Sequence, residues 1–122
     1  MKWQRTLRSW FPPGIVRWSA MLTVALLVLV WIVPSWRLVP ILEPEAIVPL
    51  HYNIYFGVDF VGKWYWVYFL PGFGTAVFIA NAILSVKERK ESKVFSDMLS
   101  ITYFVVALFV TAAMFFVLLI NV

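Results

Sequence analysis

Three long apolar stretches dominate this 122-residue chain. They run from Ser19 to Val33, from Trp64 to Val86 and from Met98 to Val122. A helix rises about 1.5 Å per residue, so ~20 apolar residues cross a hydrocarbon core about 30 Å thick. The second and third stretches meet this length, and the first meets it when it is extended from Trp18 towards Leu38. The pattern predicts an all-α membrane protein with three transmembrane helices.

Composition agrees with this class and removes several kinds of site. Hydrophobic residues make up 63% of the chain, whereas roughly half of the residues in a soluble domain are apolar. The mean hydropathy is +0.89. The chain has no cysteine, so disulfides, thiolate metal sites and cysteine nucleophiles are excluded.

Basic residues are distributed unevenly around the three stretches. Eight of the ten Lys and Arg residues precede the first span or connect the second and third. Because Lys and Arg favour short cytoplasmic loops, this bias predicts the N-terminus inside and the C-terminus outside. It also explains the net charge of +4 by topology, and we expect no nucleic-acid partner. The eight are Lys2, Arg5, Arg8, Arg17, Lys87, Arg89, Lys90 and Lys93, and the other two are Arg37 and Lys63.

We therefore expect a single membrane domain over 1–122. An amphipathic N-terminal helix, over 2–11, is predicted to lie in the plane of an anionic inner leaflet. It serves either as an anchor that sets the tilt of the first span or as a sensor of the lipid surface. The remaining segments are spans over 18–38, 64–86 and 97–122, an outer loop over 39–63 and a cytoplasmic connector over 87–96.

The outer loop combines helix-breaking prolines with strand-like alternation. Three prolines within it, the last at Pro49, exclude a long helix. In Val48–Ile54 one set of alternate side chains is apolar, as in a half-buried strand. The following segment, 56–62, contains two glycines and either returns as a second strand or forms a compact turn. The prediction is an extracytoplasmic loop with a short β-hairpin as one option.

The second span carries a ridge of small residues. Gly72, Ala76 and Ala80 recur every four residues, and such a ridge lets another helix pack closely. Gly74 belongs to the same set of helix-packing residues, and membrane helices tolerate glycine when neighbouring helices support them. Asn81 lies one position beyond the ridge, where its amide is expected to find a partner across a helix interface. We predict packing within this chain, with a homo-oligomer contact as the alternative.

The charged connector is too short to be a domain, so the second and third spans form an antiparallel helical hairpin. Ser96 is predicted to cap the third helix, and Asp97 complements the positive end of its dipole. The apolar stretches 64–86 and 98–122 contain no charged side chain, and Lys63 and Lys87 only flank the first of them. Because proton and ion paths are generally marked by charged residues inside spans, a pump or transporter is not expected.

A polar site, if there is one, lies in the outer loop. His51 is the only histidine, and Glu43, Glu45 and Asp59 are near it in sequence. A histidine with carboxylates can bind a divalent cation or shuttle a proton, so an outer-face metal-dependent enzyme is one alternative. In the other interpretation, His51 and Asn53 hydrogen-bond their own loop and brace it. We assign no catalytic residue, metal or cofactor.

The string Pro49-Leu50-His51-Tyr52-Asn53, followed by Gly57, Asp59 and Gly62, resembles a family signature. It is similar to the Pro-x-His-aromatic-Asn … Gly … Asp motif of a small bacterial membrane domain of unknown function, which also occurs in Sdp-type toxin-immunity proteins. The resemblance covers roughly residues 20–86. Gly57 falls one residue later than in the family pattern, and the chain lacks the further spans of the full immunity proteins.

The resemblance implies an outer-face motif formed by His51, Asn53 and Asp59. The first two would brace the loop or touch a partner, and Asp59 would cap the turn or pair with His51. It also fits a multi-pass protein of the bacterial cytoplasmic membrane.

The leading functional hypothesis is a non-enzymatic accessory, sensing or immunity-like membrane protein that acts through its outer loop. Because three helices enclose little volume, we expect a protein partner rather than a soluble ligand. The first alternative is a structural subunit of a larger membrane complex that packs through the second span. The second is the metal-dependent enzyme.

Overall fold

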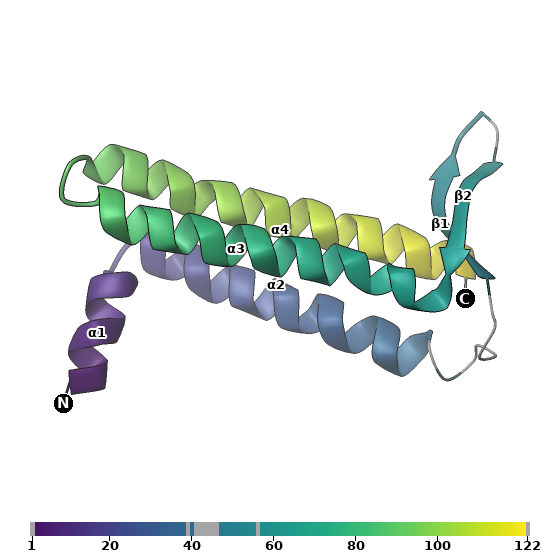
Figure 1. Cartoon of the computed structure of the whole chain (residues 1–122), viewed down its shortest axis with the longest axis horizontal. Helices are drawn as coiled ribbons and strands as arrows, with labels where there is room; N and C mark the ends of the chain where they lie inside the picture. The colour runs from purple at the N-terminus through teal and green to yellow at the C-terminus, as the bar shows by residue number, and fades with distance from the viewer. Residues whose placement is uncertain (1, 39, 41–46, 56, 122) are drawn as a thin grey trace.

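Three long helices run side by side and form a bundle (Figure 1). A computed structural model of the chain describes residues 2–38, 40, 47–55 and 57–121, and for Leu7, Leu50–Asn53 and Gly57–Phe60 it describes the backbone alone. The long helices are α2 (Ile15–Arg37), α3 (Phe69–Glu88) and α4 (Lys93–Asn121). The shorter elements are helix α1 (Lys2–Trp10), strands β1 (Ile47–Asn53) and β2 (Gly57–Lys63), and the 3₁₀ helix η2 (Trp64–Tyr68).

Each long helix is long and apolar enough to cross a membrane. Helix α2 has 23 residues, η2 and α3 together have 25, and α4 has 29. All three exceed the ~20 residues that a bilayer core requires. By the criteria of length and composition, the prediction of three membrane-spanning helices is confirmed.

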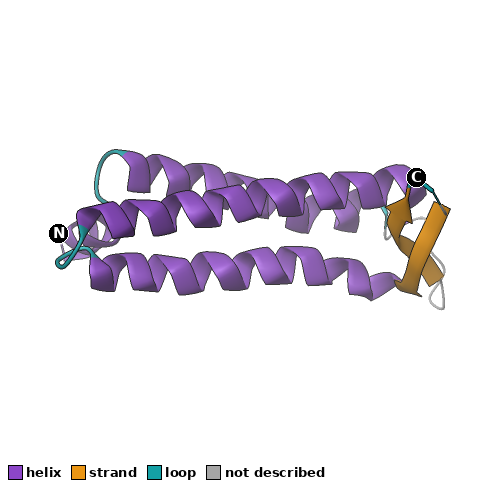
Figure 2. Ribbon diagram, turned by 90° about the horizontal axis from the view of Figure 1, so that it is seen from above, coloured by secondary structure: helices purple, strands orange, loops and turns teal. Residues whose placement is uncertain are grey.

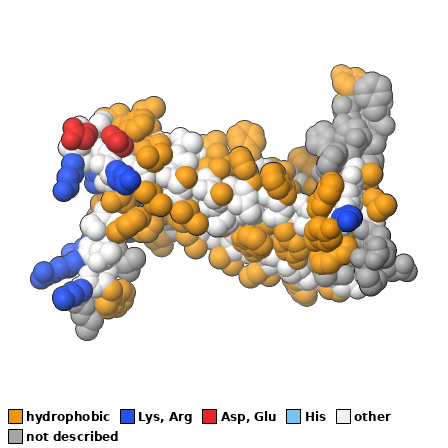
Figure 3. Space-filling view, in the orientation of Figure 1, with side chains coloured by type: hydrophobic (Ala, Val, Ile, Leu, Met, Phe, Trp, Pro, Cys, Tyr) orange, Lys and Arg blue, Asp and Glu red, His pale blue; other side chains and the backbone are white. Residues whose placement is uncertain are grey.

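The bundle has two distinct ends (Figure 1 and Figure 2). Helix α1 and the turn 89–92 between α3 and α4 lie at one end, which we call the connector end. The β1–β2 pair and the C-terminus lie at the other, which we call the hairpin end. On the face shown in Figure 3, most of the Lys and Arg side chains gather at the connector end, and apolar side chains cover the bundle between the ends.

The turn between α3 and α4 is shorter than predicted. Helix α3 continues to Glu88 and α4 begins at Lys93, so the expected connector over 87–96 is largely helical. The expected Ser96 cap is also wrong, because Ser96 lies inside α4 and is fully buried. Ser92 caps the helix instead, since its Oγ accepts a hydrogen bond from the backbone N–H of Phe95 at 3.2 Å.

Helix α1 meets α2 at a sharp turn. Gly14, the residue before α2, has a φ of 107°, a conformation that residues with a Cβ rarely adopt. Pro12 and Pro13 precede it and prevent α1 from continuing. As a result α1 runs across the end of the bundle instead of along it (Figure 1).

Helix α4 is the centre of the bundle. It packs along both α2 and α3, whereas α2 and α3 contact each other much less. The larger core cluster lies towards the hairpin end and the smaller one towards the connector end. The first comprises Val30, Leu38, Val67, Val110, Met114 and Val117, and the second Ala20, Ala82 and Tyr103.

All three long helices meet at Gly74. A Cβ at this position would lie 2.9 Å from Leu27 Cδ2 on α2 and 3.5 Å from the methyl groups of Val110 on α4. The first distance is shorter than real carbon contacts allow, so a side chain at this position would force the Leu27 side chain to move. The inclusion of Gly74 among the helix-packing residues agrees with this position.

Candidate functional site

The two strands at the hairpin end pair antiparallel with one interruption on each strand. The register places Ile47 opposite Lys63 and Asn53 opposite Gly57. Between these ends Leu50 is an extra residue on β1 and Asp59 is an extra residue on β2. Because the two register shifts compensate, the pairing is in the same register at both ends of the ladder. Such irregularities twist and bend a strand pair locally.

The side chain of Asn121, at the end of α4, ties β1 to the bundle. Its Nδ2 donates to the carbonyl oxygen of Pro49 at 2.7 Å and to that of Val117 at 2.8 Å. Next to Pro49, Val48 is only 1% exposed, and its strand partner Gly62 is also buried. The base of the hairpin is therefore fixed to the end of α4 by one amide and by apolar packing.

A second set of contacts joins α2 to η2 and α3 near this end. The indole Nε1 of Trp31 donates to Thr75 Oγ1 at 3.1 Å, and the hydroxyl groups of Ser35 and Tyr68 share a hydrogen bond. The rings of Trp31 and Tyr68 are stacked with centroids 5.9 Å apart. The sequence shows many aromatic residues in this region, but it does not indicate which hydroxyl groups they contact. This cluster stabilises the α2–α3 side, where the helices otherwise make few contacts.

The tip of the hairpin presents apolar side chains to the surroundings. Ile54 is 82% exposed and Tyr55 is 86% exposed. Further down the strands, Ile47 and Val61 are also exposed. Figure 1 shows the hairpin lying across the end of the bundle, with its tip reaching beyond the flank of α4. The hairpin thus combines a base fixed to α4 with an exposed tip.

The residues of the predicted polar motif belong to the two strands of this hairpin. His51, Tyr52 and Asn53 belong to β1, and Gly57 and Asp59 belong to β2. Their side chains lie outside the described part of the structure, as do Glu43 and Glu45 altogether. The expected pairing of Asp59 with His51, and the alternative metal site, therefore stay predictions. Among the described residues, no three His, Asp or Glu side chains could hold a metal ion.

The small-residue ridge of α3 does not pack within the chain, so that prediction is wrong. Ala76 and Ala80 are exposed, and a Cβ at Gly72 would meet nothing within 4 Å. The amide of Asn81 donates to the carbonyl oxygen of Val77 in its own helix at 2.9 Å, instead of bridging two helices. Close packing falls on Gly74, which faces the opposite side. The homo-oligomer alternative stays a prediction.

The connector end contains a buried cluster of three serines that sequence reasoning missed. Ser85 of α3 lies 2.7 Å from Ser96 and 3.3 Å from Ser100 of α4, measured between Oγ atoms. Ser85 Oγ also donates to the carbonyl oxygen of Ser96, and Ser96 Oγ donates to that of Ser85. Ser96 and Ser100 are four residues apart and therefore lie on one face of α4. This spacing is the sequence feature that could have indicated the cluster. The cluster joins the two helices where their connecting turn is short.

No family model matches the chain, and no curated protein or solved structure is significantly similar to it.

Proposed function

We propose that this chain is a non-enzymatic accessory membrane protein, with a sensing or immunity-like role, that binds a protein partner through its hairpin end. The observation that carries the proposal is the exposed tip formed by Ile54 and Tyr55 on a hairpin whose base is fixed. A preordered element loses little conformational entropy when it binds. Tyrosine is also enriched at protein interfaces because its ring is apolar and its hydroxyl can hydrogen-bond.

The direction of the overhang favours a partner in the same membrane. The tip extends sideways past α4, over the space that a neighbouring membrane protein would occupy (Figure 1). Helix α4 also presents exposed apolar side chains, among them Phe109 and Phe116, which are 73% and 63% exposed. A partner that crosses the bilayer beside α4 can contact both surfaces. The alternative without a protein partner is that Ile54 and Tyr55 lie among lipid headgroups.

We further propose that the hairpin end is extracytoplasmic in a bacterial cytoplasmic membrane. The connector end carries Lys87, Arg89, Lys90 and Lys93 together with the N-terminal basic residues. The hairpin end carries only Arg37 and Lys63 of the basic residues. The positive-inside rule then favours the N-in, C-out orientation. Exposed Trp36, Tyr65 and Trp66 at the hairpin end are suited to headgroup depth.

A structural-subunit role is the second candidate, and the exposed ridge of α3 favours it. Gly72, Ala76 and Ala80 leave a shallow surface that no described part of this chain covers. Small residues let two helices approach closely in a membrane, where van der Waals packing drives association. A partner helix, or a second copy of this chain, fits such a surface.

The two candidates differ in which substitutions disrupt the native complex. Extraction of native membranes in mild detergent, followed by native electrophoresis, measures the size of that complex. If the hairpin binds the partner, Ile54→Asp and Tyr55→Asp release the chain from the complex, and Ala76→Leu and Ala80→Leu do not. The reverse pattern favours the subunit role. Leu29→Met, a conservative change at an exposed position of α2, is the control.

Complex size that stays unchanged in all four variants contradicts both candidates. The same variants must keep their thermal unfolding midpoint, so that loss of the complex is not loss of the fold. Charged substitutions at exposed positions such as Ile54 are expected to satisfy this condition.

A further inference from the structure

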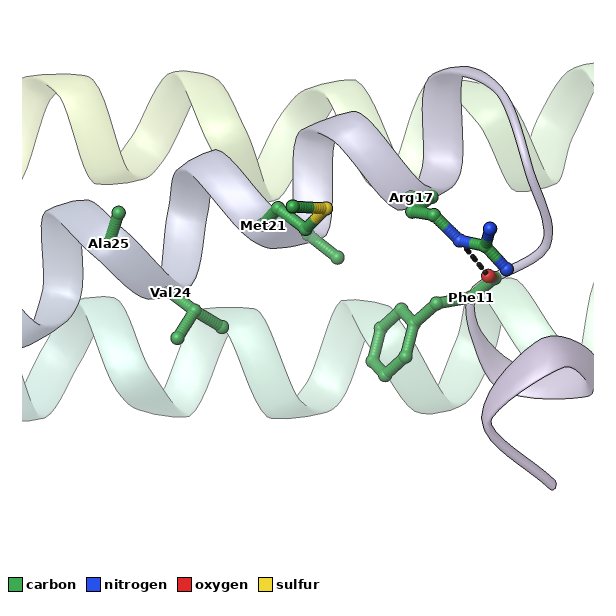
Figure 4. A pocket seen from close by; sticks show the side chains of 6 residues that line it. Phe11, Arg17, Met21, Val24 and Ala25 are labelled. Atoms are coloured by element: carbon green, nitrogen blue, oxygen red, sulfur yellow. Dashed lines mark hydrogen bonds between the residues drawn. The ribbon is translucent and has the colours of Figure 1, made fainter. Parts of the chain in front are cut away.

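A groove lies at the connector end, between the turn that follows α1 and one flank of α2. Its volume is about 570 Å³. All but one of the side chains that line it are apolar, and the exception is Arg17 at its end (Figure 4). The lining residues are Phe11, Arg17, Ala20, Met21, Val24 and Ala25.

The wall formed by Phe11 is held in place from two sides. Arg17 Nε donates a hydrogen bond to the backbone carbonyl oxygen of Phe11 at 3.2 Å. The Phe11 ring stacks on Phe78 of α3, with centroids 6.5 Å apart and planes 4° from parallel. Phe78 in turn meets Tyr103 of α4 edge-on at 4.9 Å. The groove is therefore preformed by contacts to all three long helices.

The groove opens towards the surroundings of the bundle. Met21 and Val24 are 57% and 46% exposed, while Ala20 behind them is only 5% exposed. Since Met21, Val24 and Ala25 are all exposed, no other described helix covers this flank of α2. In a membrane the open side faces lipid.

Charge and depth together indicate what occupies the groove. Arg17 is the third residue of α2, and Ala25 lies eight residues further on, or about 12 Å along the helix axis. One leaflet of the hydrocarbon core is about 15 Å deep, so the apolar part of the groove fits within one leaflet. Arg17 is half-buried at the headgroup end, and it forms no ion pair with any described carboxylate. One of its donors is used by Phe11, and its remaining N–H groups suit a phosphate.

We propose that this groove binds one anionic phospholipid, with its phosphate at Arg17 and an acyl chain along Met21, Val24 and Ala25. Exposed Arg5 and Arg8 on the adjacent α1 attract anionic lipid to the same surface. We assign selectivity to Arg17, because it is the only charged side chain among the described residues that line the groove. This site is at the opposite end from the hairpin and does not depend on the proposed function.

Native mass spectrometry of the full chain in detergent tests the headgroup half of the proposal. The protein is incubated with equal amounts of phosphatidylglycerol and phosphatidylcholine that carry the same acyl chains. We expect one retained lipid, with phosphatidylglycerol preferred. Arg17→Gln is expected to lower the preference about fivefold, which corresponds to the roughly 1 kcal/mol that a basic residue gains beside anionic lipid. Arg17→Lys keeps most of the preference, and Arg37→Gln at the other end is the matched control.

Filling the groove tests the acyl-chain half. Met21→Trp is expected to reduce retention of both lipids, whereas Met98→Trp, at a similarly exposed methionine of α4, leaves retention unchanged. An equal loss of preference in Arg17→Gln and Arg37→Gln contradicts a site at Arg17, as does no loss in either. Unchanged retention in Met21→Trp also contradicts the proposal. Loss of a dimer instead of a lipid in that variant assigns the groove to a second copy of the chain.

Discussion

Different interactions connect neighbouring elements at the two ends of this bundle. At the connector end, Ser85, Ser96 and Ser100 form a buried hydrogen-bonded cluster between α3 and α4. At the hairpin end, the helices meet in an apolar cluster, and the polar link to β1 is the amide of Asn121. Three short side chains thus link α3 to α4 at the connector end, whereas one amide and apolar packing link α4 to β1 at the hairpin end.

The difference follows from how the chain connects the helices. A short turn holds α3 and α4 together at the connector end, so small side chains are needed for close approach. At the hairpin end the chain leaves α2 and returns only through β1, β2 and η2, and the space between is filled by larger residues such as Leu38 and Val67. The connector end is thus suited to rigidity, whereas the hairpin end leaves an exposed tip for binding.

The largest loss of stability is expected from a substitution at Gly74, which lies between the two ends where the three helices are tightly packed. Gly74→Leu would force a side chain into Leu27 and Val110, because even a Cβ would lie 2.9 Å from Leu27. We expect a loss of about 1–3 kcal/mol in the free energy of unfolding, measured by thermal unfolding in detergent. Gly72→Leu, two residues away and facing open space, is the matched control. Equal losses in both variants would mean that the two faces of α3 have been assigned wrongly.

The next largest effect is expected at the connector end. Ser85→Ala removes the hydroxyl that contacts both Ser96 and Ser100, and should cost about 1–2 kcal/mol in the same assay. Thr102→Ala is the control, because the Thr102 hydroxyl is exposed and bonds only the Met98 carbonyl oxygen of its own helix. A Ser85→Ala variant as stable as the Thr102→Ala variant would show that the serine cluster does not join α3 to α4.

A smaller effect is expected at the hairpin end. Asn121→Leu removes the hydrogen bond to Pro49, at a cost of about 0.6 kcal/mol to global stability. Backbone amides of β1 should then exchange faster with deuterium, because the base of the hairpin is no longer tied to α4. Asn81→Leu, which removes an amide bonded only within its own helix, should leave β1 protection unchanged. No change in β1 exchange after Asn121→Leu would contradict the anchoring role.

The smallest effect on stability is expected at the tip. Ile54→Asp should change the free energy of unfolding by less than about 0.5 kcal/mol, because Ile54 is 82% exposed. Thermal unfolding in the same detergent checks this. A clear loss of stability would mean that Ile54 packs on the bundle and is not available for contact with a partner.

The number of spans could be predicted from the sequence because uninterrupted apolar length is a sufficient signal for a membrane helix. The face of each span that packs in the interior of the bundle could not be predicted, because lipid and the protein core are both apolar. Gly72, Ala76 and Ala80 therefore suggested an internal ridge, whereas the close contact is at Gly74.

The polar contacts were harder still to predict. Ser96 fits the pattern of an N-cap, but Ser92 performs that role because α4 begins four residues earlier than expected. The partner of Asn121 is 72 residues away in sequence, and no local pattern indicates it.

The proposed function requires that the hairpin tip, and not the ridge of α3, contacts the partner. The most direct measurement is photocrosslinking in native membranes with a photoreactive residue at Tyr55, and in parallel at Ala76 and at Leu29, which is exposed on α2. We expect that the Tyr55 probe captures one specific protein, that Ile54→Asp in the same chain abolishes this capture, and that the Ala76 probe captures none. Capture from Ala76 alone, or the same products from Tyr55 and from the Leu29 control, would contradict a partner contact at the tip.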